Sequence, residues 1–348
     1  MDRRNNFDAL RFLAASSVIL SHAVLLATGQ QDDDPLMRLT NGQLVLGVAG
    51  VFVFFVISGY LVTQSWEQTR SLPRFAAKRA LRIFPGLAAC ILALTLGLGP
   101  LVTSLPLAQY FSAYGTYEFL VANLLLLTDY NTLPGVWFTG QAIGNVVDGP
   151  LWSLPVEVVM YAMVTALGML RAIRWPVLVL LLVVGTVCLC LDTTRYFGFI
   201  GSVGWMLGFF VVGMALYRLR EQRWILSGTA ALLALAGLVA SVPLGVFLQV
   251  FPILGGVLII YVALHPALPI IPAAHFGDLS YGLYIYGWPV EQTVLYLRPG
   301  TGPVALFVIA FAVTGAVAFL SWHLVEKRAL RWKPRGAITS KPAAAPAL

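Results

Sequence analysis

The sequence has few charged residues. Asp, Glu, Lys and Arg make up only 11% of its 348 residues, whereas 59% are hydrophobic and the mean hydropathy is +0.84. This composition excludes an ordinary soluble domain, because a soluble surface needs far more charge, and it requires a polytopic membrane protein. We therefore expect lipid to be the solvent for most of the fold.

Cysteine and histidine are also scarce. The three cysteines, Cys90, Cys188 and Cys190, fall in apolar stretches and have neither metal-ligand nor disulfide spacing. The four histidines are scattered and form no cluster with Cys or carboxylates. Phosphate-loop and dinucleotide fingerprints are absent as well. We expect no metal site and no tightly bound cofactor.

Hydropathy predicts an all-α integral membrane protein with about ten transmembrane helices. The predicted spans are Leu10–Thr28, Leu44–Trp66, Phe75–Leu98, Leu151–Leu170, Trp175–Leu191, Phe199–Leu219, Trp224–Val242, Gly245–Leu264, Leu279–Leu297 and Val304–Val325. A further apolar segment, Phe119–Thr128, is too short to cross. It lies in the long loop Gly99–Pro150, which we expect to fold back as a re-entrant or interfacial wall over the outer mouth.

The placement of Lys and Arg predicts the orientation. With the N-terminus inside, the basic residues gather on the cytoplasmic side, and only Arg38, Arg195 and Arg298 fall outside. This N-in, C-in topology accounts for the formal charge of +7 without a nucleic-acid partner. We expect a multi-pass protein whose partner is the lipid bilayer.

No composition shift divides the apolar part of the chain. We expect one membrane domain over residues 1–332 and a disordered Pro/Ala-rich cytoplasmic tail over residues 333–348. The acidic run Asp32–Asp34 lies in the first outer loop, and its composition favours a solvated loop.

His22 and Arg11 are the most informative ionisable residues in the first span. They are eleven residues apart. In a helix this spacing places them within about 20° of the same face and about 16 Å apart along the axis. Ionisable groups inside a membrane are costly unless they line a wet or ligand-filled path. This stripe of one helix face, from Arg11 to His22, therefore predicts a site for a long ligand with a charged end.

A second basic feature begins the third span. Arg79 and Arg82 are i,i+3 neighbours, so their guanidinium groups share one helix face and suit phosphate oxygens. The positive-inside bias alone also supplies arginine at this position. Arg79 and Arg82 are predicted to lie at the same depth in the membrane as Arg11, which favours a functional role for them.

Glu157 is a carboxylate about two turns into the fourth span, two residues after Pro155. It is expected in the same half of the membrane as His22, where it would orient the imidazole or bind a substrate hydroxyl. The alternative is an interhelical hydrogen bond that holds the bundle together.

Two other stretches have weaker signals. Small residues from Gly47 to Gly59 favour close packing of the second span against its neighbours. Aromatic residues after Leu279 are typical of an interfacial belt, and Ser280 and the nearby Tyr hydroxyls are candidates to line a donor path.

Taken in order, these elements resemble the acyltransferase 3 family of bacterial membrane O-acyltransferases over almost the whole chain. The family's Arg-x10-His pattern matches Arg11 and His22, and its Phe-Phe-Val-x-Ser-Gly stretch matches Phe54 to Gly59. Its other motifs are Arg-x-x-Arg, Leu-Trp-Ser-Leu-x-x-Glu and Ser-Tyr-x-Leu-Tyr, and they match Arg79 to Arg82, Leu151 to Glu157 and Ser280 to Tyr284. Gly287 stands where many members carry a histidine, so no role is assigned to it.

The resemblance implies transfer of an acyl group, usually acetyl from cytoplasmic acetyl-CoA, to a hydroxyl of a carbohydrate or glycolipid at the bacterial inner membrane. Arg11, Arg79, Arg82, Ser280 and Tyr281 would bind acyl-CoA, His22 would be the general base and Glu157 its partner. A covalent route through His22 or Ser21 is the competing mechanism. A transporter or flippase for a lipid-linked sugar or amphipathic molecule is the alternative from another class.

Overall fold

The computed structural model describes residues 5–127, 130–138, 143–273 and 275–333. In these residues the regular structure is helical, and a helix occupies each of the ten predicted spans. They are α1 (Phe7–Thr28), α3 (Leu46–Thr69), α4 (Leu72–Ala93), α8 (Ser153–Met169), α9 (Trp175–Cys190), α10 (Thr194–Arg218), α11 (Gly228–Ser241), α12 (Phe247–Leu264), α13 (Ser280–Leu297) and α14 (Pro303–Ser321). The all-α membrane fold is confirmed.

Seven of the described helical segments are long and apolar enough to cross a membrane. Those seven contain α1, α3, α4, α8, α10, α12 and α14, and some of them also include an adjoining short helix. Of the other three helices, α9 and α11 are shorter, and α13 is buried along most of its length. Burial by neighbouring helices lets α13 carry polar side chains that lipid would not tolerate. Ten crossings and the N-in, C-in orientation stay predictions.

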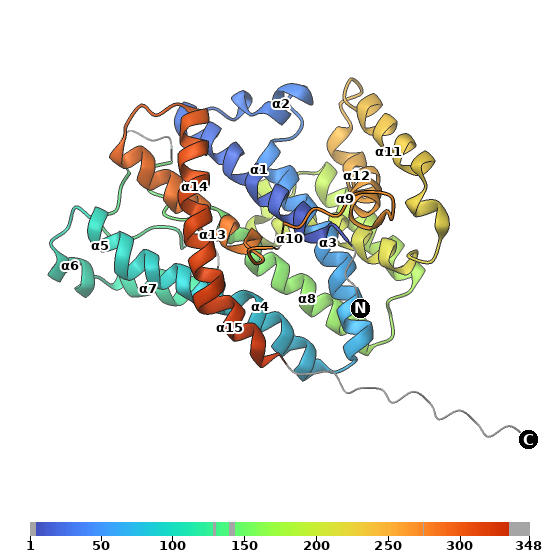
Figure 1. The fold of residues 1–348 in the computed structure, drawn as a ribbon, viewed down its shortest axis with the longest axis horizontal. Helices are drawn as coiled ribbons and strands as arrows, with labels where there is room; N and C mark the ends of the chain where they lie inside the picture. The colour runs from blue at the N-terminus through green and yellow to red at the C-terminus, as the bar shows by residue number, and fades with distance from the viewer. Residues whose placement is uncertain (1–4, 128–129, 139–142, 274, 334–348) are drawn as a thin grey trace, which may run out of the picture.

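Short helical pieces complete the chain. They are Gln31–Asp33, α2 (Pro35–Leu39), Leu94–Leu98, α5 (Gly99–Val102), α6 (Leu107–Ser112), α7 (Tyr114–Leu124), Pro150–Trp152, Arg223–Leu226, Trp322–Glu326, α15 (Lys327–Ala329) and Leu330–Trp332. The predicted short apolar segment, Phe119–Thr128, begins within α7, and its last residue, Thr128, lies outside the described residues. Helix α7 packs beside α4 (Figure 1). The exposed face of α7 includes Tyr114, Tyr117 and Val121, as expected of a helix that meets lipid or its interface.

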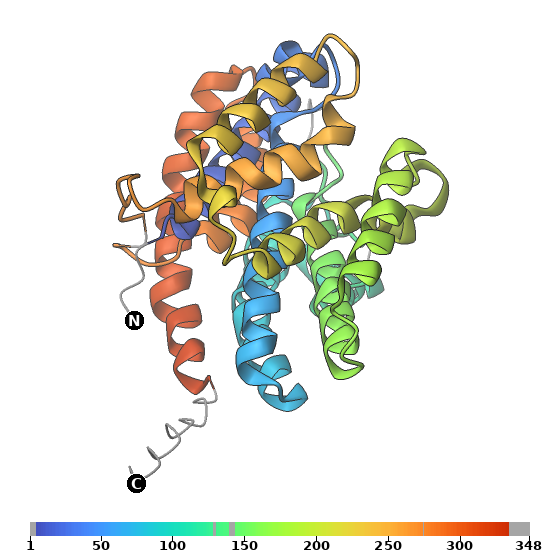
Figure 2. The same cartoon turned by 90° about the vertical axis from the view of Figure 1, so that its right-hand side faces the viewer.

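Helix α3 runs through the middle of the bundle and packs against α1 and α10 (Figure 2). Glycines make this possible, as the small-residue pattern predicts. A Cβ atom on Gly50 would meet the backbone oxygen of Ala14 in α1. A Cβ atom on Gly59 would collide with the backbone of Phe210 in α10, and one on Gly213 would collide with α3 in return. The close contact of these helices therefore depends on glycine, which has no side chain, at these positions.

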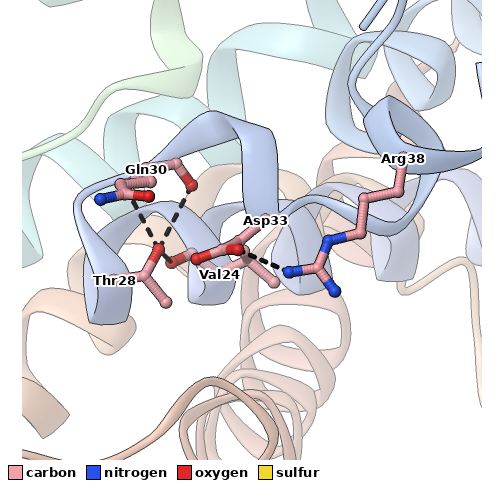
Figure 3. Close-up of polar contacts among 5 residues, drawn as sticks. All are labelled: Val24, Thr28, Gln30, Asp33 and Arg38. Atoms are coloured by element: carbon pink, nitrogen blue, oxygen red, sulfur yellow. Dashed lines mark hydrogen bonds and ion pairs between the residues drawn. The ribbon is translucent and has the colours of Figure 1, made fainter. Parts of the chain in front are cut away.

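The segment after α1 folds back toward the bundle. The Thr28 hydroxyl donates to the backbone oxygen of Val24 at 2.9 Å and accepts from the Gln30 amide at 3.1 Å, which closes the end of α1 (Figure 3). Arg38 pairs with Asp33 at 2.6 Å on the exposed side of the same segment (Figure 3).

Asp34 corrects the expectation of a solvated acidic loop. Its side chain is only 1% exposed. One carboxylate oxygen accepts from the backbone amides of Leu36, Met37 and Leu46, and the other accepts from the Ser21 hydroxyl at 2.5 Å. The carboxylate caps α2 and ties α1, α2 and α3 together, so its burial is compensated by four donors.

The predicted tail, residues 333–348, lies outside the described residues except for Lys333.

Replacing Gly59 with Ala tests the α3–α10 contact. The added methyl has no free space, so we expect Gly59→Ala to lower the free energy of unfolding by about 1–3 kcal/mol or more. Gly315→Ala in α14 is the matched control, because nothing lies within 4 Å of the position of its Cβ. Thermal unfolding in detergent measures both. Equal melting temperatures for the two variants would contradict the packing argument.

Removing the Asp34 carboxylate tests the tie between α1, α2 and α3. Asp34→Ala leaves three backbone amides and one hydroxyl without their acceptor. We therefore expect the free energy of unfolding to fall by about 2 kcal/mol or more. Asp32→Ala serves as the control, since Asp32 is exposed. A melting temperature for Asp34→Ala as high as that of Asp32→Ala would show that the buried carboxylate contributes nothing.

Candidate active site

A cavity of about 440 Å³ lies where α1, α3, α4, α8 and α13 meet. It brings together six of the seven site residues predicted from the sequence, and we call it the arginine cavity. Those six are Arg11, Arg79, Arg82, Glu157, Ser280 and Tyr281. They come from four helices, so the structure joins motifs that are far apart in the chain.

Arg82 is held in place on two sides. It pairs with Asp278, in the loop before α13, at 2.8 Å, and its guanidinium lies over the Tyr281 ring at 5.7 Å. Burial alone would raise the pKa of Asp278, but Arg82 and Arg11, with hydrogen bonds from Ser280, bring that pKa below its ordinary value. Asp278 is therefore ionised at neutral pH, and it fixes the orientation of the Arg82 guanidinium group.

Arg79 differs from its neighbour. Its guanidinium lies over the rings of Tyr161, at 5.6 Å, and Phe75, at 5.9 Å. Among the described residues no carboxylate pairs with it, and its buried Nε has no hydrogen-bond partner. Its donors are available to an anionic ligand, for which a planar guanidinium is well suited.

Cationic side chains outnumber carboxylates in the arginine cavity. The cations are Arg11, Arg79, Arg82 and Lys333, and the carboxylates are Asp8, Glu157 and Asp278. Arg11 and Asp8 are 3.7 Å apart, a looser contact than that between Arg82 and Asp278. The cavity thus suits a ligand that brings negative charge with it.

Ser280 and Tyr281 act through these arginines. The Ser280 hydroxyl donates to Asp278 at 2.7 Å, and the Tyr281 hydroxyl donates to the backbone oxygen of Ile83 at 2.9 Å. Both hydroxyls are therefore occupied, and the two residues set the positions of Asp278 and Arg82.

His22 lies in a second, smaller cavity of about 130 Å³, which we call the histidine pocket. Its wall includes Trp152, Trp288 and Asp34. Asp34 belongs to the loop after α1, whereas Asp8 and Arg11 of the arginine cavity lie near the start of α1. The two cavities therefore open from opposite halves of α1, and they share two lining residues, Val51 and Tyr284.

The carboxylate beside His22 is Glu291 of α13. His22 Nδ1 lies 3.8 Å from Glu291 Oε2, and the Trp288 ring meets the imidazole edge-on with centroids 4.9 Å apart. Glu291 is fully buried, and neither of its carboxylate oxygens has a hydrogen-bond partner among the described residues. His22 Nδ1 is buried as well, so Nε2 is the ring nitrogen left to face the pocket.

The expected pairing of Glu157 with His22 is wrong in its geometry. One oxygen of Glu157 accepts from Ser58 at 2.8 Å and from Tyr161 at 2.6 Å, all within the arginine cavity. Hydropathy gives Glu157 an approximate depth, but it does not give the direction in which α8 faces. Glu291, like Glu157, is a carboxylate inside a predicted span, and this is the signal that could have identified it as a site residue. The sequence analysis did not name it.

The arrangement provides two chemical functions in one bundle. The arginine cavity supplies charge-assisted donors for phosphate or another anion. The histidine pocket places an imidazole 3.8 Å from a buried carboxyl group, a pairing that is common at sites of proton transfer.

Comparison with known proteins agrees with this chemistry. The sequence profile of the acyltransferase 3 family, described as an acyltransferase domain, matches residues 4–323. Nodulation protein 10 of Rhizobium leguminosarum bv. viciae is 30% identical over 94% of this chain and 94% of its own length. The O-acetyl transferase of Shigella phage Sf6 is 30% identical over 95% of this chain and 97% of its own length. No solved structure matches the chain significantly.

The profile covers most of the chain and includes the charged residues that line the two cavities, apart from Lys333. With its apolar helices, the chain therefore belongs to the acyltransferase 3 family and is a multi-pass membrane O-acyltransferase.

Proposed function

We propose that this enzyme transfers an acetyl group from cytoplasmic acetyl-CoA to a hydroxyl of a cell-envelope or secreted carbohydrate, across the bacterial inner membrane. The observation that carries the proposal is the pair of cavities that meet at Val51 and Tyr284. The name of the Shigella phage relative, an O-acetyl transferase, supports the choice of acetyl.

Acetyl-CoA enters the arginine cavity in this proposal. Its phosphates bind Arg79 and Arg82, and its pantetheine arm extends along the stripe from Arg11 to His22, about 16 Å along α1. Glu157 uses one oxygen for Ser58 and Tyr161, which leaves the other for the amide hydrogens of the arm. The thioester then reaches the histidine pocket.

The acceptor enters the histidine pocket from the other side. Trp152 and Trp288 line this pocket together with Asp34 and Gln31. Aromatic faces and polar side chains together suit a sugar, whose ring has apolar C–H faces and hydroxyl edges.

The reaction needs one base. His22 Nε2 takes the proton of the acceptor hydroxyl as its oxygen attacks the thioester carbonyl carbon. The tetrahedral intermediate then loses the thiolate as the C–S bond breaks, and the proton passes from His22 to sulfur. The products are the O-acyl sugar and coenzyme A. Glu291, 3.8 Å from Nδ1, stabilises the transient imidazolium.

Substitutions at His22 and Glu291 test this mechanism. We expect His22→Gln to lower kcat by about 10²–10⁴-fold, the usual effect of losing a general base. Glu291→Gln keeps the shape but replaces the ionisable carboxyl group beside the imidazole with an amide, and should lower kcat by about 10²-fold or more with little change in donor KM. Release of coenzyme A and formation of O-acetyl product by purified protein measure both.

His265→Gln is the control, since His265 lies in a loop outside both cavities. Full turnover by His22→Gln would exclude the base role, and a wild-type protein that uses no acyl-CoA at all would refute the donor assignment.

The arginine cavity predicts a binding defect that is separate from the chemical step. Arg82→Gln loses a charge-assisted contact worth about 1.5–3 kcal/mol, so we expect KM for acetyl-CoA to rise about 10–100-fold. Arg174→Gln, an exposed arginine outside the cavity, should leave KM unchanged. Initial rates at varied acetyl-CoA concentration separate the two effects. An unchanged KM in Arg82→Gln would show that the donor phosphates bind elsewhere.

A further inference from the structure

The arginine cavity and the histidine pocket share two lining residues, and we call the place between these two side chains the neck. Among the residues that line the arginine cavity and the histidine pocket, only Val51 of α3 and Tyr284 of α13 are common to both. Both side chains are buried. In the proposed function, the thioester passes these two side chains on its way from the arginines to His22.

Tyr284 is held firmly. Its hydroxyl lies 2.6 Å from the Ser153 hydroxyl and donates to the backbone oxygen of Pro150 at 3.1 Å. Its ring meets the Phe54 ring edge-on at 5.7 Å. A ring with contacts at its hydroxyl and at its face does not swing aside without breaking them.

Val51 sits at an equally tight place. It follows Gly50, where a Cβ atom would meet the backbone of Ala14 in α1. Helix α3 therefore cannot move closer to α1, and the close contact fixes where the Val51 side chain projects. The neck has two fixed walls.

The room beyond the neck is small. The histidine pocket has a cavity volume of about 130 Å³, less than a third of that of the arginine cavity, about 440 Å³. It must hold the acyl group and the acceptor hydroxyl beside His22 at the same time. Two carbons and one oxygen of an acetyl group fit this space, and each further methylene needs additional room.

We infer that Val51 and Tyr284, as walls of the histidine pocket, limit the room for the acyl group, so that the enzyme uses acetyl-CoA and rejects donors with longer chains. This inference rests on the proposed function, because it assumes that the thioester travels from the arginine cavity to His22. It assigns both side chains as specificity-determining residues of the transfer reaction.

The test compares donors in wild-type protein and in variants of the neck. Purified protein is assayed with acetyl-CoA and butyryl-CoA, and the ratio of their kcat/KM values is the readout. Val51→Ala and Tyr284→Leu have smaller side chains and should raise the butyryl-to-acetyl ratio by about 10-fold or more. This is the usual effect of making room for one more methylene group in an apolar pocket. Val51→Ile narrows the neck and should lower the ratio further.

Two controls separate size from other effects. Tyr284→Phe keeps the ring and its contact with Phe54 but removes the hydroxyl, so its ratio should rise less than that of Tyr284→Leu. Val53→Ala makes the same change as Val51→Ala two residues along α3, outside both cavities. Its ratio should equal that of wild type. The ratio is insensitive to a general loss of stability, because both donors are measured on the same protein.

Unchanged ratios in Val51→Ala and Val51→Ile, with acetyl transfer retained, would overturn the inference while the proposed function stands. A wild-type protein that already uses butyryl-CoA as well as acetyl-CoA would also overturn it. Failure of the wild type to use any acyl-CoA is a different result, since it refutes the proposed function itself.

Discussion

The cost of burying charge inside a membrane protein is the constraint on which the rest of this structure depends. Arg11, Arg82, Glu157 and Glu291 all lie within helices, where lipid contact would be expensive. Each instead faces a cavity, a partner or another buried ionisable group. Helices α1, α4 and α8 turn Arg11, Arg82 and Glu157 toward the arginine cavity, and α13 turns Glu291 toward His22. Glycines in α3 let this helix come close to its neighbours.

This arrangement divides the interior into two cavities with different chemistry. The arginine cavity is positively charged, and its guanidinium groups are fixed by Asp278 and by aromatic rings. The histidine pocket is smaller and places the His22 imidazole beside the buried carboxyl group of Glu291. Separate binding of an anionic donor and a neutral acceptor, with chemistry where the two sites meet, is what such a division favours.

Much of this could be predicted from the sequence. Hydropathy located the helices, and the spacing of Arg11 with His22 and of Arg79 with Arg82 identified faces that do line cavities. Spacing within one helix does not reveal which neighbour that face meets, so it paired His22 with Glu157 and missed Glu291 on α13. Asp34 was misread for the same reason: its four donors come from α1, α2 and the start of α3, which only the fold brings together.

The central claim is that one ligand path joins the arginines to His22. The most direct measurement is a structure of the purified protein with an acetyl-CoA analogue whose thioester sulfur is replaced by a methylene group. We predict phosphates bound to Arg79 and Arg82, and the analogue's carbonyl carbon beyond Val51 and Tyr284, with room for an acceptor oxygen between it and His22 Nε2 at about 3–3.5 Å from the carbon. A carbonyl that stops beside Glu157 in the arginine cavity, or phosphates bound away from both arginines, would contradict the account.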